Sequence, residues 1–176
     1  MSTLEPLQYE IEIVDDQHHL PIDSAWLRDV VEETLKLEQV HSAEISVALI
    51  DNERIHPLNR EFLEHDYATD VLSFLLECET VGTHDQVGSG LPLGAGKRLC
   101  GEVVVSADMA IERAAEFDWS PREELVLYVI HGLLHLCGYN DHSDADREMM
   151  RSRESEVLQM WNMKPHDFVS DLPQEK

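Results

Sequence analysis

The histidine-rich segment at residues 131–142, HGLLHLCGYNDH, constrains this chain more than any other stretch of its sequence. His131 and His135 are four residues apart in a long apolar run, so on a helix their rings lie about 40° apart around the axis and face the same way. Gly138 follows at a point where a helix can end in a left-handed residue, which glycine adopts without steric cost. The chain can then fold back and bring His142 beneath the end of the helix.

This arrangement predicts a metal site. His131, His135 and His142 would supply three nitrogens to one zinc ion and leave a fourth tetrahedral position for water, as in catalytic zinc sites. Two histidines at this spacing are also compatible with ordinary packing, and the third histidine after a helix-stopping glycine is what favours the metal. Cys137 lies about 200° around the helix from His135, so we expect its sulfur to point away from the metal and into the core.

The length and composition of the chain indicate a single globular domain. With 176 residues, 43% of them hydrophobic and 28% charged, the chain can form one substantial core. We expect the domain to span residues 1–164 and residues 165–176 to be a frayed tail. Neither a secretory signal nor an apolar run of membrane-spanning length is found, and three irregularly spaced cysteines are typical of reduced thiols. The sequence therefore predicts a soluble cytoplasmic protein with no membrane partner.

The net charge is a difficulty for any proposal that the partner is a nucleic acid. Lysine and arginine total 13 and aspartate and glutamate total 36, which gives −23. Such a field repels a phosphate backbone. Charges farther apart than about 8 to 10 Å are largely screened at physiological salt, however, so a local cationic groove is still possible.

Hydrophobic periodicity and capping residues predict the order of the elements. Four strands are expected at residues 9–14, 43–50, 71–76 and 99–105, and helices at 24–38, 53–64, 107–117, 121–137 and about 144–163. The strand at 71–76 is mostly apolar, so we expect it inside the sheet. The glycine-rich segment 82–97 is expected to be a loop.

The helix at 121–137 is the predicted centre of the fold. Ser120, Pro121 and Glu123 combine an N-cap, a proline at the first helical position and a capping-box acid. The helix is apolar on nearly all faces, which indicates burial. Gly132 inside it costs about 1 kcal/mol relative to alanine, which suggests close approach of another backbone or of a ligand. The fold class is therefore α+β: a single domain in which a mixed four-stranded sheet packs with helices around a buried helix that carries the metal-binding motif.

The residue after the first histidine bears on the chemistry. In the zinc-protease motif H-E-x-x-H this position holds a glutamate that acts as general base, whereas here it holds Gly132. The metal must then be the main source of an activated water. Zinc can lower the pKa of bound water from about 15.7 to roughly 7, so hydroxide is available near neutrality.

Four sequence blocks resemble the YbeY family of zinc-dependent endoribonucleases. HGLLHLCGYNDH is similar to that family's H-G-x-L-H-L-x-G-Y-D-H signature, and LNREFLEHDYATDVLSF at residues 58–74 is similar to its L-N-x-x-Y-R-x-x-D-x-x-T-D-V-L-S-F block. LCGEVVVS at 99–106 and SPREELVLYVIHG at 120–132 also match. The blocks occur in the family's order and cover most of residues 45–150.

The resemblance implies an α+β fold, one Zn²⁺ per chain and cleavage of single-stranded RNA. It also implies a role in maturing the 3′ end of small-subunit ribosomal RNA and in ribosome quality control, with ribosomal RNA or the small subunit as partner and no DNA. Two rival functions stay open. A zinc hydrolase of peptides or other small substrates is disfavoured by Gly132, and a nonenzymatic ribosome-associated factor would be favoured by four protein ligands on the zinc.

The first departure from the family pattern concerns the third ligand. Six residues separate His135 from His142, where the family has five. Either one residue is inserted and His142 is still the ligand, or Asp141 occupies the ligand position and contributes an oxygen. We favour His142, because catalytic sites with three histidines are well known and a short loop can absorb one residue.

The second departure concerns arginine. The family has arginines at two places in the 58–74 block, and this chain has Arg60 at the earlier place and Leu63 at the later one. The resemblance implies that Arg60 is catalytic together with His131 and His135, and a guanidinium could stabilise phosphate charge near the metal through a bidentate contact. The alternative is a surface arginine beside Glu61 and Glu64. Thr69, Asp70 and Ser73 could shape the groove, although Asp70 could cap a turn and Ser73 could be an ordinary strand residue.

Overall fold

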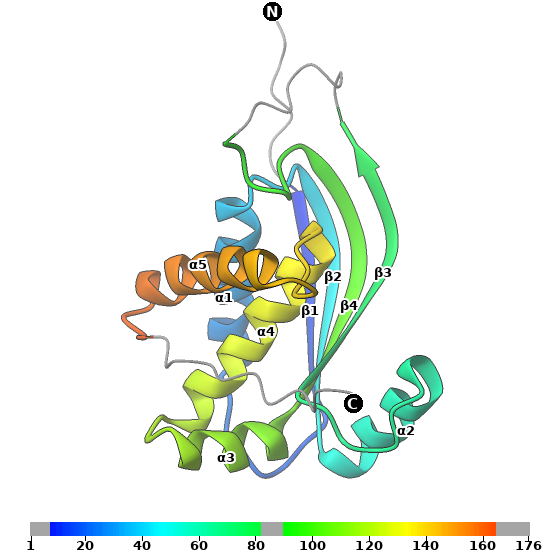
Figure 1. The fold of residues 1–176 in the computed structure, drawn as a ribbon, viewed down its shortest axis with the longest axis vertical. Coiled ribbons are helices and arrows are strands. Elements are labelled where there is room, and N and C mark those ends of the chain that lie inside the picture. Colours follow the sequence, from blue (N-terminus) through cyan, green and yellow to red (C-terminus); the bar gives the residue numbers. More distant parts are fainter. Residues whose placement is uncertain (1–7, 82–89, 165–176) are drawn as a thin grey trace, which may run out of the picture.

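The computed structural model describes residues 8–81 and 90–164 and has the predicted α+β architecture (Figure 1). Residues 165–176, expected to fray, and the first half of the expected 82–97 loop, residues 82–89, lie outside this range. In chain order the elements are β1 (Gln8–Asp15), α1 (Ser24–Leu37), β2 (Ser42–Ile50), α2 (Asn52–Leu63), β3 (Val71–Thr80), β4 (Lys97–Ser106), α3 (Ala107–Glu116), α4 (Pro121–Cys137) and α5 (Asp144–Met160).

The four strands form one mixed sheet in the order β1-β2-β4-β3. β1, β2 and β4 are parallel, and β3 pairs antiparallel with β4. Parallel neighbours need a crossover connection, which α1 provides between β1 and β2. Figure 1 shows α1, α3, α4 and α5 on one side of the sheet and α2 on the other. The side chains separate accordingly into a large core under α4 and a small cluster of Ile50, Ile55, Leu72 and Val104 under α2.

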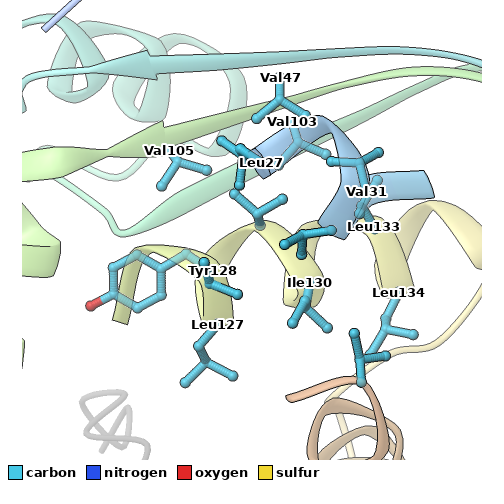
Figure 2. Packing of buried hydrophobic residues seen from close by; sticks show 14 of the residues in the cluster. Leu27, Val31, Val47, Val103, Val105, Leu127, Tyr128, Ile130, Leu133 and Leu134 are labelled. Atoms are coloured by element: carbon cyan, nitrogen blue, oxygen red, sulfur yellow. The ribbon is translucent and has the colours of Figure 1, made fainter. Parts of the chain in front are cut away.

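The helix α4 is the buried centre of the molecule, as its sequence predicts. Its N-terminus has the capping box formed by Ser120 and Glu123, with Pro121 in the first turn. Figure 2 shows its apolar side chains between β2 and β4 on one side and α1 on another. Although α4 is strongly apolar, no helix in the described part of the chain is long and apolar enough to cross a membrane.

The position of β3 differs from the sequence prediction. β3 lies at the edge of the sheet rather than inside it. Its first residues are nevertheless covered on both faces, because Val71 packs on the α4 side and Leu72 on the α2 side. Apolar residues on both faces at the start of a strand therefore show that both faces are covered there. They do not require a neighbouring strand on each side. From Leu75 to Thr80, beyond these helices, the strand is exposed.

Gly132 marks the place where α4 comes closest to the sheet. A Cβ atom at this position would lie 2.6 Å from Val103 Cγ1, 3.0 Å from Ser73 Oγ and 3.1 Å from Val71 Cγ2. The Ser73 hydroxyl donates a hydrogen bond to the Gly132 carbonyl at 3.1 Å. The close approach predicted at Gly132 is therefore made by strand side chains rather than by another backbone, and it fixes α4 on β3 and β4.

We predict that Gly132→Ala destabilises the protein. Helix propensity alone would stabilise the variant by up to about 1 kcal/mol, but overpacking against Val103 should outweigh this and lower the free energy of unfolding by about 1 to 3 kcal/mol. Urea unfolding measures the difference. Ser152→Ala, on an exposed position of α5, serves as the control and should change stability by less than about 0.5 kcal/mol. A Gly132→Ala variant more stable than the wild type would contradict the close packing.

Candidate metal centre

The two helical histidines face each other at the C-terminal end of α4. Their Nε2 atoms are 3.0 Å apart, and their rings meet edge to face with centroids 4.6 Å apart. The four-residue spacing on α4 produces this geometry, as predicted, because side chains at i and i+4 lie on the same face of a helix. Both rings are half-buried.

The other nitrogen of each ring is occupied by a protein acceptor. His131 Nδ1 lies 2.7 Å from Glu154 Oε1, and His135 Nδ1 lies 3.0 Å from the Tyr139 carbonyl oxygen. A carbonyl or carboxylate oxygen only accepts hydrogen bonds, so each Nδ1 carries the proton. In the neutral rings, the two Nε2 lone pairs then point toward each other across 3.0 Å and repel. A cation bound between the two nitrogens would remove this repulsion.

The distances fit a metal ion. Zn²⁺ binds histidine nitrogen at about 2.0 to 2.1 Å, which places two tetrahedral ligand nitrogens roughly 3.3 Å apart. The observed separation of 3.0 Å between His131 and His135 is close to this value. The hydrogen bonds at both Nδ1 atoms are the outer contacts that commonly orient metal-binding histidines.

Asp141 completes a group of three. In the described part of the chain, the side chains that could together hold a metal are His131, His135 and Asp141, whose ligand atoms lie within 4.8 Å of one another. His142, which the sequence favoured as the third ligand, lies outside this group and is exposed. The structure thus brings together the two helical histidines with the alternative third residue that the sequence left open.

The end of α4 positions the loop that carries Asp141. Gly138 adopts the left-handed conformation with φ 113°, as predicted, and the amides of Gly138 and Tyr139 donate to the Leu134 carbonyl. Lys97 Nζ donates to the Cys137 carbonyl at 2.7 Å, which satisfies another of the last carbonyls of the helix. The chain therefore reverses immediately after α4.

The far end of the loop is fixed by the start of α5. Ser143 caps α5 and forms a capping box with Asp146. Between the two helices, Asn140 Oδ1 accepts from the His142 amide at 3.2 Å, and Arg147 donates to the Asp141 carbonyl at 2.9 Å. These bonds hold the short loop in the conformation that places the Asp141 carboxylate beside the histidines.

Two other residues considered in the sequence lie away from this group. Cys137 is fully buried in the core, in agreement with the expected direction of its sulfur. Arg60 lies on α2, on the opposite side of the sheet from α4, is exposed, and faces Asp66 Oδ1 at 3.8 Å. The structure therefore does not gather Arg60 with the histidines.

The residues of the 69–73 segment have local contacts. Asp70 Oδ1 accepts from the Val71 amide at 2.8 Å and from the Thr69 hydroxyl at 3.0 Å, so Asp70 bonds its neighbours at the bend before β3. Ser73 binds the backbone of α4 at Gly132. Of these residues, Ser73 is the one whose hydrogen bond holds β3 against the helix that carries the histidines.

Burial and nearby carboxylates act in opposite directions on the pKa values of the two histidines. Burial lowers the pKa of His131, but the hydrogen bond to Glu154 and the charges of Glu154, Asp70 and Asp141 outweigh it, so the pKa of His131 is raised. Burial, followed by the neighbouring His131, lowers the pKa of His135. The pair therefore attracts one positive charge, either a proton on His131 or a metal ion that replaces it.

Glu154 is a site residue that the sequence analysis missed. It lies on α5, 23 residues from His131, among Met150, Val157 and Leu158 on the buried face of that helix. An acid within an apolar stripe was the available signal, because a buried carboxylate requires a partner.

A buried ion pair next to Glu154 fixes the position of α5. Arg153 Nε donates to Glu38 Oε1 at 2.8 Å, and Glu38 is fully buried at the end of α1. Removing one partner of such a pair leaves an uncompensated buried charge. This pair therefore ties α5 to α1 and holds Glu154 in reach of His131.

These features define an α+β protein with a candidate two-histidine, one-carboxylate metal centre at the end of a buried helix. The family model described as Endoribonuclease YbeY matches residues 10–162. A protein named Endoribonuclease YbeY from Salinibacter ruber is 37% identical over 154 residues, which are 88% of this chain and 90% of the relative. Its namesake from Geobacillus thermodenitrificans is 34% identical and aligns with 85% of this chain and 94% of the relative.

The structural comparison agrees. A solution structure of a Thermotoga maritima protein superimposes with a TM-score of 0.52 at 26% sequence identity and covers 94% of this chain and 99% of that one. The chain belongs to the YbeY endoribonuclease family.

We predict that Glu154→Gln weakens metal binding about 10- to 100-fold, as is typical when an outer partner of a metal-binding histidine is lost. The neutral amide no longer holds the His131 ring with a charged acceptor. Isothermal titration with Zn²⁺ measures the affinity. Glu156→Gln, two residues along α5 at an exposed partner of Arg153, is the matched control and should bind like the wild type. Equal affinities of all three proteins would show that Glu154 does not support the centre.

Proposed function

We propose that this protein is a zinc-dependent endoribonuclease that cleaves single-stranded RNA. The observation that carries the proposal is the convergence of two imidazole Nε2 lone pairs and the Asp141 carboxylate at one point. Three protein ligands leave room for a water or a substrate oxygen, as in catalytic zinc sites. Membership of a family of endoribonucleases identifies RNA as the substrate class.

We further propose that the biological substrate is ribosomal RNA, at the 3′ end of the small-subunit species, and that the protein acts in the cytoplasm in ribosome maturation and quality control. The support is the likeness to that family in the blocks at 58–74, 99–106 and 120–142. Single-stranded RNA ends and RNA loops present accessible bases and sugars. Such a substrate suits a metal centre formed beside the short loop between α4 and α5.

The third ligand in this proposal is Asp141 rather than His142. Asp141 is supported by its place in the group of three, and the hydrogen bonds of Asn140 and Arg147 hold it there. A carboxylate oxygen is an ordinary zinc ligand. Compared with a third imidazole, it also adds one negative charge to the centre.

The chain's own residues hold the reacting groups in place. When bound, the ion would act as a Lewis acid and lower the pKa of a coordinated water. His131 and His135 are oriented by Glu154 and by the Tyr139 carbonyl, and Gly132 provides no carboxylate base beside them. Arg60, with its exposed guanidinium, would contact an RNA phosphate at a distance from the metal. Either water or the ribose 2′-hydroxyl can serve as the nucleophile.

We predict that Asp141→Ala lowers zinc affinity by more than the roughly 10- to 100-fold expected for an outer partner, whereas His142→Ala leaves it within a factor of a few. Removing a direct ligand should cost more than removing an exposed neighbour. Competition with a chromophoric chelator measures both dissociation constants. A larger loss of zinc affinity in His142→Ala than in Asp141→Ala would contradict the proposal and identify His142 as the ligand.

We predict that the purified protein cleaves single-stranded RNA, that a chelator abolishes cleavage, and that added Zn²⁺ restores it. His135→Ala should lose cleavage, because it removes a ligand, while His142→Ala should retain it. Denaturing gels follow the reaction, and analysis of the product ends identifies the nucleophile: a 2′,3′-cyclic phosphate indicates the 2′-hydroxyl. Cleavage that persists in His135→Ala would point to a contaminating nuclease and contradict the proposal.

A further inference from the structure

The loop between α2 and β3 carries two exposed rings that the metal centre does not use. His65 and Tyr67 stack with their centroids 5.3 Å apart and their planes 12° from parallel. Both side chains are exposed. A parallel pair of flat rings at the surface has the shape on which a nucleic-acid base can stack.

The rings are held in place by the backbone of their loop. Glu64 ends α2 in the left-handed conformation with φ 60°, and the His65 amide bonds the Asn59 carbonyl at 3.4 Å. Asn59 is buried, and its Nδ2 donates to the Tyr67 carbonyl at 2.9 Å. The loop is therefore already ordered before binding, so a base that stacks here would cost little additional conformational entropy.

The loop leads directly to the strand that contacts the metal helix. Three residues after Tyr67, Asp70 accepts a hydrogen bond from the amide of Val71, the first residue of β3. Val71 and Ser73 of β3 then pack against Gly132, which adjoins His131 on α4. The loop with the ring pair and the helix with the histidines are thus both joined to the first residues of the edge strand β3.

The open face of the sheet is an unfavourable path for RNA. Glu10, Glu44 and Glu77 lie in one cross-strand row around Cys100. With Glu79 and Arg98 of the neighbouring row, they line a hollow of about 620 Å³. An acidic face of this kind repels a phosphate backbone. Because Glu77 and Glu79 lie on the distal half of β3, the repulsion leaves the start of β3, next to the rings, as the more favourable place for RNA.

The charges around the rings are mixed. Asp66, between the two rings in sequence, faces His56 Nε2 at 2.8 Å and Arg60 at 3.8 Å, which partly offsets its charge. The exposed Glu61 and Glu64 still oppose phosphate. Attraction between charges is therefore weak at this corner, and stacking, which does not depend on net charge, would have to supply the affinity.

We propose that the His65–Tyr67 ring pair is a subsite that stacks on a base of the single-stranded RNA substrate. This inference rests on the proposed function, because it takes RNA as the substrate. The subsite positions the strand through a base, while the metal centre acts on the backbone at another nucleotide. Since every base has an aromatic face, the subsite should tolerate different sequences.

The test measures RNA binding by fluorescence anisotropy, using a labelled mixed-sequence single-stranded oligoribonucleotide and the full chain in chelator so that cleavage does not interfere. Tyr67→Ala should bind about 5- to 150-fold more weakly, the range for one lost base–aromatic stack. Tyr67→Phe keeps the ring and should bind like the wild type. Met160→Ala, an exposed apolar position at the end of α5, is the control and should also be unchanged.

A second readout separates stacking from a structural effect of the substitution. Oligonucleotides with an abasic residue at successive positions should reveal one position where the missing base weakens binding to the wild type but does not weaken binding to Tyr67→Ala further. If Tyr67→Ala binds every oligonucleotide as the wild type does, the subsite is refuted while cleavage by the wild type still supports the proposed function. If the wild type neither binds nor cleaves RNA, the proposed function fails and the subsite fails with it.

Discussion

The close contact between α4 and the sheet at Gly132 is the constraint on which the candidate site depends. Without a side chain at this position, the helix can lie against Val103, Val71 and Ser73, and the Ser73 hydroxyl bonds its backbone. The depth and rotation of α4 then determine where His131 and His135 point. Gly138 ends the helix at the turn where the chain can reverse, and the short loop that follows returns Asp141 to the same point. The contact of Gly132 with the sheet therefore positions the helix and the loop that bring the ligand atoms of His131, His135 and Asp141 together.

Charge has opposite consequences at the centre and over the rest of the molecule. The carboxylates of Glu154, Asp70 and Asp141 favour a cation between the histidines, as the raised pKa of His131 indicates. The same excess of acids, with a net charge of −23, opposes the approach of RNA. A bound divalent ion would reverse the sign of the local field only near the reacting phosphate. Binding away from the ion must then rely on short-range contacts, for which hydrogen bonds and ring stacking are better suited than long-range attraction.

The sequence predicts those features that depend on neighbouring residues. The capping box at Ser120, the end of α4 at Gly138 and the shared face of His131 and His135 all follow from helical geometry within a few positions. Features that depend on contacts between distant segments could not be predicted from the sequence in this way. The edge position of β3 depends on α2 and α4 covering its two faces, and the partnership of Glu154 with His131 depends on how Arg153 and Glu38 fix α5. The orientation of Asp141 follows from the bonds of Asn140 and Arg147 in a loop where the sequence allowed either register.

The most direct measurement is X-ray absorption spectroscopy at the zinc edge on the wild-type chain after loading with Zn²⁺. We expect one ion per chain, with two histidine nitrogens at about 2.0 to 2.1 Å, oxygen ligands at about 2.0 to 2.2 Å and no sulfur at about 2.3 Å. Uptake of no ion, or a shell that contains sulfur, would contradict a centre formed by His131, His135 and Asp141.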